Sequence, residues 1–136
     1  MKKTILLYVL AVFMTNCNIS VAGNVKVKLT YPSDAGMPSL NVYLKNTLTN
    51  KIYSYTTKGD EYNYEFKNIP AGKYIAYCYL NEPNATLSAG YTKFVPCGLS
   101  VNCKDHSFIE FDVTEKGTMD NIDIGDWYGA EVPAQK

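Results

Sequence analysis

The sequence comprises 136 residues, of which 46% are hydrophobic and 19% are charged, and its 13 basic residues balance 13 acidic ones. All of the basic residues are lysines, so the chain lacks the bidentate arginine fork that commonly binds phosphate and carboxylate groups. The balanced charge gives no electrostatic reason to expect nucleic acid or an anionic membrane as a partner, and the length suits one domain.

The first 22 residues have the organisation of a signal peptide. Two lysines precede an apolar run over residues 4–14, which is too short to span a bilayer, and Ser20-Val21-Ala22 has the small residues of a cleavage site. We therefore expect an exported protein, periplasmic or secreted, that keeps 11 lysines and 13 acids, a net charge of about −2. In a less favoured alternative Cys17 is lipidated, although bulky Asn16 stands where such signals have a small residue.

Alternating apolar and polar residues predict four strands in the first part of the exported chain. In the first of them Val25, Val27 and Leu29 alternate with polar residues, which is typical of a strand buried on one face. Prolines, glycines and polar residues separate the strands as turns. The four predicted strands cover residues 24–31, 40–46, 51–57 and 62–67.

A nearly continuous apolar segment over residues 73–80 predicts a central strand that is covered on both faces. We expect a turn over residues 68–72 before it, because Pro70 fixes φ and Gly72 accepts positive φ. After this strand we expect a loop over residues 81–90, a short strand over 91–95, further strands over 107–114 and 119–128, and a loosely held tail.

No segment after residue 22 shows a sustained helical period. Short strands with turn signals every eight to twelve residues are typical of an all-β protein. We expect residues 23–136 to form a single antiparallel β-sandwich of seven to eight strands, with a prealbumin-like or immunoglobulin-like arrangement.

Residues 66–80 resemble the transthyretin-like and carboxypeptidase-regulatory-like sandwich domains of exported bacterial proteins. The resemblance lies in aromatic Phe66, in the turn Ile69-Pro70-Ala71-Gly72-Lys73-Tyr74, and in the apolar strand that follows. It extends over most of residues 24–128 and implies a β-sandwich that serves as an accessory, adhesive or structural domain. The turn residues that carry it are Ile69, Pro70, Gly72 and Tyr74.

The activities of two branches of the transthyretin-like proteins need residues that this chain lacks or places unfavourably. One hydrolyses a purine breakdown product with several histidines and arginines, whereas this chain has one histidine and no arginine. The other, found in adhesin repeats, cross-links a first-strand lysine to a last-strand asparagine beside a buried acid. Lys26 or Lys28 with Asn121 would take these roles, but strand alternation places both lysines on the polar face.

Cys97 and Cys103 are best interpreted as a disulfide. Export favours oxidation, and Gly98 allows the sharp turn that a small ring needs. The chain-entropy contribution of so short a ring is about 2.4 kcal/mol. A metal site with Asp105 and His106 is less favoured, because aspartate is a hard ligand and no fourth soft ligand is evident.

Catalysis by Cys103 and His106 is also disfavoured, since a cysteine in a disulfide has no thiolate. We therefore expect no catalytic residue, and we interpret His106 as an ordinary loop residue. Cys78 lies in the predicted central strand and is expected to be buried and inert. The acids near the C-terminus do not match the spacing of a calcium loop and are weak metal candidates, namely Asp120, Asp123 and Asp126.

These features predict a non-catalytic module without a cofactor that acts by binding a protein or by structural support. The alternative is a carbohydrate- or calcium-dependent recognition module that uses surface tyrosines or the acidic C-terminal loop. The candidate binding surfaces are the loop over residues 81–104 and a possible aromatic platform of Tyr53, Tyr55, Tyr62 and Tyr64. The same tyrosines also suit a half-buried pleated sheet.

Overall fold

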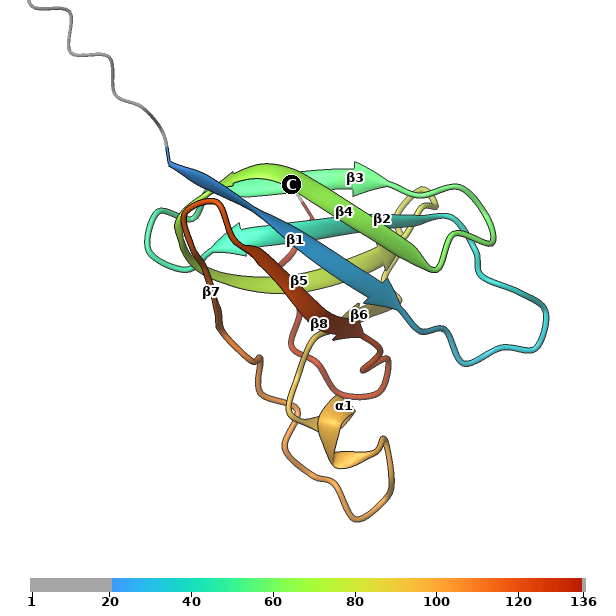
Figure 1. The fold of residues 1–136 in the computed structure, drawn as a ribbon. Helices are drawn as coiled ribbons and strands as arrows, with labels where there is room; N and C mark the ends of the chain where they lie inside the picture. Colours follow the sequence, from blue (N-terminus) through green and yellow to red (C-terminus); the bar gives the residue numbers. More distant parts are fainter. Residues whose placement is uncertain (1–20, 136) are drawn as a thin grey trace, which may run out of the picture.

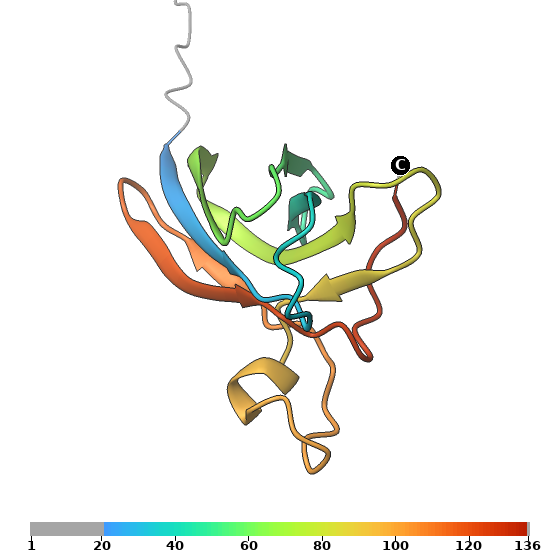
Figure 2. The ribbon, with the colours of Figure 1, turned by 90° about the vertical axis from the view of Figure 1, so that its right-hand side faces the viewer.

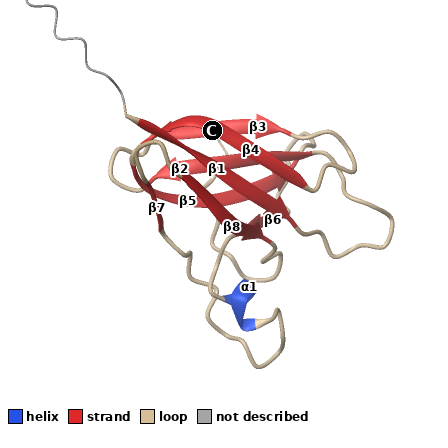
Figure 3. Cartoon of the chain, in the orientation of Figure 1, coloured by secondary structure: helices blue, strands red, loops and turns tan. Residues whose placement is uncertain are grey.

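A computed structural model describes residues 21–135, which form two β-sheets and one short helix (Figure 1). One sheet has the strand order β4-β1-β8, and the other has the order β3-β2-β5-β6 with β7 also paired to β5. The elements are β1 Ala22–Leu29, β2 Leu40–Asn46, β3 Ile52–Thr56, β4 Asn63–Pro70, β5 Gly72–Leu80, β6 Ser88–Gly90, α1 Phe94–Cys97, β7 Phe111–Val113 and β8 Thr118–Ile124. The predicted all-β sandwich is therefore confirmed (Figure 3).

Most of the predicted signal peptide, including Cys17, lies outside the described residues. Ala22, the last residue of that predicted segment, is the first residue of β1. Within residues 21–135 there is no helix with the length and apolar character needed to cross a bilayer.

The core lies between the two sheets and follows from the period-two pattern of the strands. Val25, Val27 and Leu29 of β1 are buried, while Lys26 and Lys28 project to the outer face, as their alternation predicts. Burial of these aliphatic side chains is the main source of stability in such a sandwich. Ile122 and Ile124 of β8 are buried beside them in the same sheet, and the core residues of the facing sheet include Leu40, Val42 and Leu44 of β2 and Ala76 and Cys78 of β5.

The first and last strands, β1 and β8, are neighbours and run parallel, which is the one parallel pair among the described strands. The pairing moves from Val25 opposite Met119 to Val27 opposite Ile122, so β8 contains one extra residue there. Asn121, in this bulge, has φ 61°, a left-handed conformation that asparagine tolerates better than most residues. The bulge changes the direction in which the polar residues of β8 project.

The apolar-Pro-x-Gly segment makes a tighter turn than predicted. β4 continues to Pro70 and β5 begins at Gly72, so Ala71 alone separates two strands where we expected a five-residue turn. The hydroxyl of Tyr74 donates a hydrogen bond to the Pro70 carbonyl at 2.8 Å, which fixes the turn to the central strand. The prediction that β5 is central is confirmed, because it pairs with β2, β6 and β7.

The segment between β5 and β7 differs most from expectation. The predicted strand over residues 91–95 is wrong: residues 88–90, expected as loop, form β6, and α1 begins at Phe94. A short apolar run fits a helical turn as well as a strand, and Gly98, with φ 109°, ends this one in the left-handed region. Of the predicted strand over residues 107–114, only Phe111–Val113 is β7, with an isolated bridge between Phe108 and Thr92.

The C-terminal tail is attached to the outer face of the larger sheet, contrary to the expectation that it is loosely held (Figure 2). The hydroxyl of Tyr79 donates to the Pro133 carbonyl at 2.9 Å. Tyr77 on the same face is buried, and desolvation raises its pKa to about 12. The composition of the tail gives no sign of this hydrogen bond, because the contact with Tyr79 is tertiary.

Cys78 provides a test of the core. Its thiol is buried between the sheets, and desolvation raises its pKa to about 12, so the reactive thiolate is strongly disfavoured. We expect no labelling by iodoacetamide at pH 8 in the native protein without residues 1–22, and one labelled thiol after unfolding without reductant, as measured by intact mass. Labelling of the native protein, or three labelled thiols after unfolding, would contradict this packing.

Candidate functional site

Residues 92–107, here called the protrusion, extend away from the two sheets beside the end of β8 (Figure 1). The protrusion begins at Thr92, includes α1, and returns to the sandwich at Ser107. It overlaps the C-terminal half of the predicted binding loop over residues 81–104.

A disulfide between Cys97 and Cys103 closes the outer part of the protrusion, with 6.0 Å between their Cα atoms. The backbone N–H of Cys103 also donates to the Ser100 carbonyl at 2.9 Å, which adds a turn inside the ring. Because Cys103 is bonded to Cys97, it has no thiolate for the Cys–His chemistry considered above.

The ring presents two aliphatic side chains to solvent, here called the tip. Val101 is 93% exposed and Leu99 is 38% exposed. Leu99 has φ 52°, an unusual conformation for a residue of this kind, and its N–H donates to the Phe94 carbonyl. The covalent ring and these bonds hold the tip in one arrangement without burying it.

The base of the protrusion is held by the carboxylate of Asp126, which is fully buried. One oxygen, Oδ2, accepts hydrogen bonds from the Thr92 hydroxyl at 2.7 Å and from Nδ1 of His106 at 2.8 Å. The other, Oδ1, accepts from the backbone N–H groups of Tyr128 and Gly129 at 3.2 and 3.3 Å. Asp126 thus connects the first residue of the protrusion, a residue near its end and the chain that follows β8.

His106 is a structural partner of this carboxylate and not the ordinary loop residue that the sequence suggested. Since a carboxylate only accepts, Nδ1 of His106 carries a proton. The ring stacks on Phe94 of α1 with 4.4 Å between ring centroids, and its side chain is 28% exposed. Gly129 lies so close that an added Cβ would be 2.7 Å from the imidazole.

Asp126 also differs from the solvated acid that we expected. It and the other two weak metal candidates have separate surroundings, with Asp120 exposed and Asp123 bound to Lys28 and Thr30. Over residues 21–135 no group of three or more His, Cys, Asp or Glu side chains is arranged to hold a metal ion. No signal in the sequence connected Thr92, His106 and Asp126, because their contact is tertiary.

An ion pair on the surface of the protrusion also stabilises it. Lys93 Nζ lies 3.2 Å from Asp105 Oδ2, and both side chains are largely exposed. Hydrogen bonds from the Ser107 hydroxyl and backbone N–H, together with Lys93, lower the pKa of Asp105 to about 2. Asp105 is therefore ionised at neutral pH and serves to order the returning chain.

The four tyrosines of the predicted platform do not form one exposed row. Tyr55 of β3 and Tyr64 of β4 stack face to face, with 3.6 Å between ring centroids, and so join the edges of the two sheets. Tyr53 packs toward Tyr74 and is half-buried. Tyr62 alone is strongly exposed, at 48%. Three of the four therefore have a packing role.

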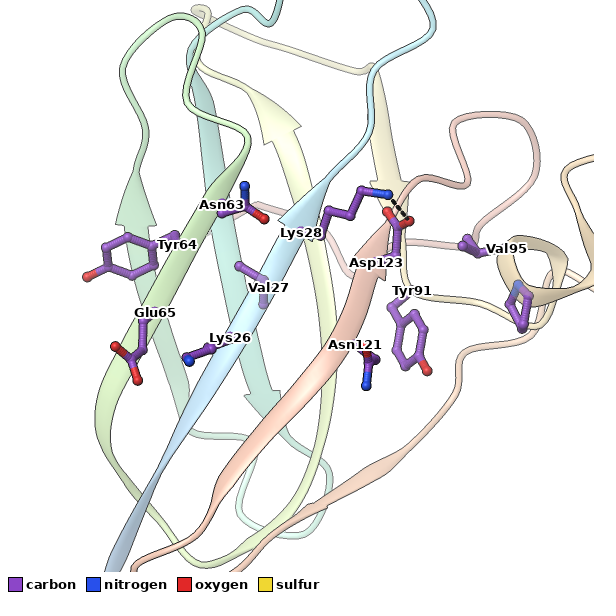
Figure 4. A pocket seen from close by; sticks show the side chains of 11 residues that line it. Lys26, Val27, Lys28, Asn63, Tyr64, Glu65, Tyr91, Val95, Asn121 and Asp123 are labelled. Atoms are coloured by element: carbon purple, nitrogen blue, oxygen red, sulfur yellow. Dashed lines mark ion pairs between the residues drawn. The ribbon is translucent and has the colours of Figure 1, made fainter.

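A groove of about 830 Å³ lies on the outer face of the β4-β1-β8 sheet (Figure 4). Polar side chains of the three strands line its floor. One side is lined by Tyr91, just before the protrusion, and by Val95 and Pro96 within it. In this groove Lys28 Nζ lies 3.3 Å from Asp123 Oδ2. The polar lining residues are Lys26, Lys28, Asn63, Glu65, Asn121 and Asp123.

The residues considered for a lysine–asparagine cross-link all line this groove. Lys26, Lys28 and Asn121 are exposed, in agreement with the strand alternation. Lys28 is paired with Asp123, whose side chain is partly exposed, so the groove does not supply the buried acid of the adhesin arrangement.

Comparison with known proteins identifies no relative: no protein-family model, no curated protein and no solved structure matches this chain. The resemblance to transthyretin-like domains therefore stays a hypothesis. The protrusion and the groove are the features of this chain that bear on its function.

The Asp126 contacts predict a specific loss of stability. Replacing Asp126 with alanine leaves the buried Thr92 hydroxyl and two backbone N–H groups without an acceptor, so we expect the free energy of unfolding to fall by about 2–4 kcal/mol. Urea unfolding followed by Trp127 fluorescence measures this loss. As a control, exposed Asp120→Ala is expected to stay within about 0.5 kcal/mol of the unmodified protein. Equal effects of the two substitutions would contradict the role assigned to Asp126.

Proposed function

We propose that this chain is an exported, non-catalytic β-sandwich module that binds a partner protein through the tip of its protrusion. The observation that carries the proposal is the exposure of Leu99 and Val101 on a ring closed by the Cys97–Cys103 disulfide. The β-sandwich acts as the rigid support from which the tip projects.

Exposure of these side chains supports binding because apolar groups gain free energy when a partner removes them from water. Complete burial of one aliphatic side chain of this size is worth about 1.5–3 kcal/mol. Single exposed aliphatic residues are common on protein surfaces, but here two of them lie in one short covalent ring that projects from the sheets.

Restriction of the ring supports the same function. A flexible loop loses conformational entropy when it is ordered by a partner, and a loop that is already ordered avoids much of this cost. The disulfide, the stacking of His106 on Phe94 and the Lys93–Asp105 ion pair all restrict the protrusion before any partner binds. Binding is therefore the function that this arrangement favours over passive structural support.

Export and the lack of catalysis are parts of this proposal. The N-terminal pattern supports export, and the intramolecular disulfide suits an oxidising environment. The resemblance to carboxypeptidase-regulatory-like domains supports an accessory role, since modules of that type commonly serve as binding or structural domains.

The proposal predicts that the tip contacts a partner in the cell that exports the protein. A photoreactive amino acid at position 101 is expected to form a discrete cross-linked protein product, detected by gel shift and mass spectrometry. In that background Leu99→Ser is expected to reduce the product at least about tenfold, since it removes much of the apolar contact.

The matched control uses Leu48, which is 80% exposed in the turn between β2 and β3 and lies outside the protrusion. The photoreactive amino acid at position 48 is expected to give no such product, and Leu48→Ser is expected to leave the product from position 101 unchanged. The same products from positions 48 and 101 would show non-specific apolar contact and would contradict the proposal.

A further inference from the structure

The groove on the β4-β1-β8 sheet is a second surface with binding character, separate from the tip. Its floor is formed by side chains of three paired strands, so its shape does not depend on a mobile loop (Figure 4). Its volume of about 830 Å³ falls in the range of ordinary ligand sites.

The charges in the groove balance. Lys26 and Lys28 provide two positive charges, and Glu65 and Asp123 provide two negative charges. A polyanion would meet both carboxylates as well as the lysines, and a polycation would meet the reverse. The lining therefore favours a ligand that carries no net charge but many hydrogen-bonding groups.

The polar groups are arranged to hold such a ligand. Asp123 is oriented by the Thr30 hydroxyl at 2.8 Å and by Lys28 at 3.3 Å, while the ammonium group of Lys28 can donate further hydrogen bonds. The bulge in β8 contains Asn121, whose side chain lines the groove, as does that of Tyr91 (Figure 4). Bulges of this kind often direct a side chain toward a functional site.

Tyr91, Val95 and Pro96 supply an apolar side to an otherwise polar groove. Tyr91 is half-buried against the core, and its ring lies edge-on to Phe111 with 6.4 Å between the ring centroids, which restricts the movement of the ring. A fixed aromatic ring beside amides and carboxylates suits the C–H face and the hydroxyl groups of a sugar ring.

An extended peptide is less suitable for this groove. Peptides that add to a sheet pair with the free edge of a strand, whereas β1 at the centre of the floor is already paired with β4 and β8. Only side chains remain to bind a ligand across the floor.

From these features we infer that the groove is a binding site for a neutral oligosaccharide. The carboxylates of Glu65 and Asp123 accept hydrogen bonds from its hydroxyl groups, and the amides of Asn63 and Asn121 both accept and donate. The lysines donate to its oxygens, and Tyr91 stacks on a sugar ring. This site does not depend on the partner protein proposed for the tip.

An NMR titration of the ¹⁵N-labelled exported protein tests this inference. The probes are the neutral hexasaccharides of cellulose, starch, chitin and mannan, with a heparin hexasaccharide and a hexapeptide of alternating lysine and glutamate as comparisons. We expect one or more neutral hexasaccharides to shift the amide signals of Lys28, Glu65 and Asn121. The comparison probes are expected to leave those signals unchanged.

Two mild variants connect that binding to the groove. Asn63→Ala removes the amide of an accessible side chain, and Glu65→Gln replaces one acceptor oxygen of an accessible carboxylate with an NH2 donor. Each is expected to weaken binding about fivefold. The matched control Glu115→Gln, in the exposed turn before β8, is expected to leave the affinity unchanged. Circular dichroism verifies that all three variants are folded.

Three results would overturn the inference. They are the absence of shifts with every neutral hexasaccharide, shifts confined to residues outside the groove, and preferential binding of the heparin fragment or the peptide in the groove. The cross-linking experiment at position 101 is independent of all of them, so failure of one proposal leaves the other standing.

Discussion

The buried carboxylate of Asp126 makes the hydrogen bonds on which the position of the protrusion depends. A carboxylate excluded from water is unfavourable unless hydrogen bonds compensate for its lost solvation, and here four donors do so. The donors come from Thr92, from His106 and from the chain after β8. Formation of this one site therefore fixes where the protrusion leaves the sandwich, where it returns and where the C-terminal tail begins.

The fixed protrusion has two consequences for binding. Its outer end carries the disulfide ring with Leu99 and Val101, and its first residues stand beside the groove on the β4-β1-β8 sheet (Figure 1). The parallel pairing of β1 with β8, and the bulge at Asn121, complete the floor of that groove. One tertiary contact thus positions both the tip and one side of the groove, two surfaces that differ in chemistry.

The sequence predicted those parts of the molecule that local patterns determine. The strand over residues 40–46 was predicted with its observed bounds, because apolar residues alternate there and the register follows from that period. The Cys97–Cys103 disulfide was predicted from spacing and export. The helix at Phe94 was missed because four apolar residues fit helix and strand equally, and the Asp126 site was missed because His106 lies 20 residues away in sequence. The groove was missed because strand order decides which polar residues become neighbours.

The central claim is that the protrusion is held rigidly on the sandwich before any ligand binds. Backbone ¹⁵N relaxation of residues 97–103, measured on the oxidised protein without residues 1–22, tests it most directly. We expect order parameters of about 0.85 for residues 97–103, equal to those of β1 and β5. Values below about 0.6 across the ring, with rigid strands, would show that the disulfide and the Asp126 contacts do not order the tip, and would contradict the account.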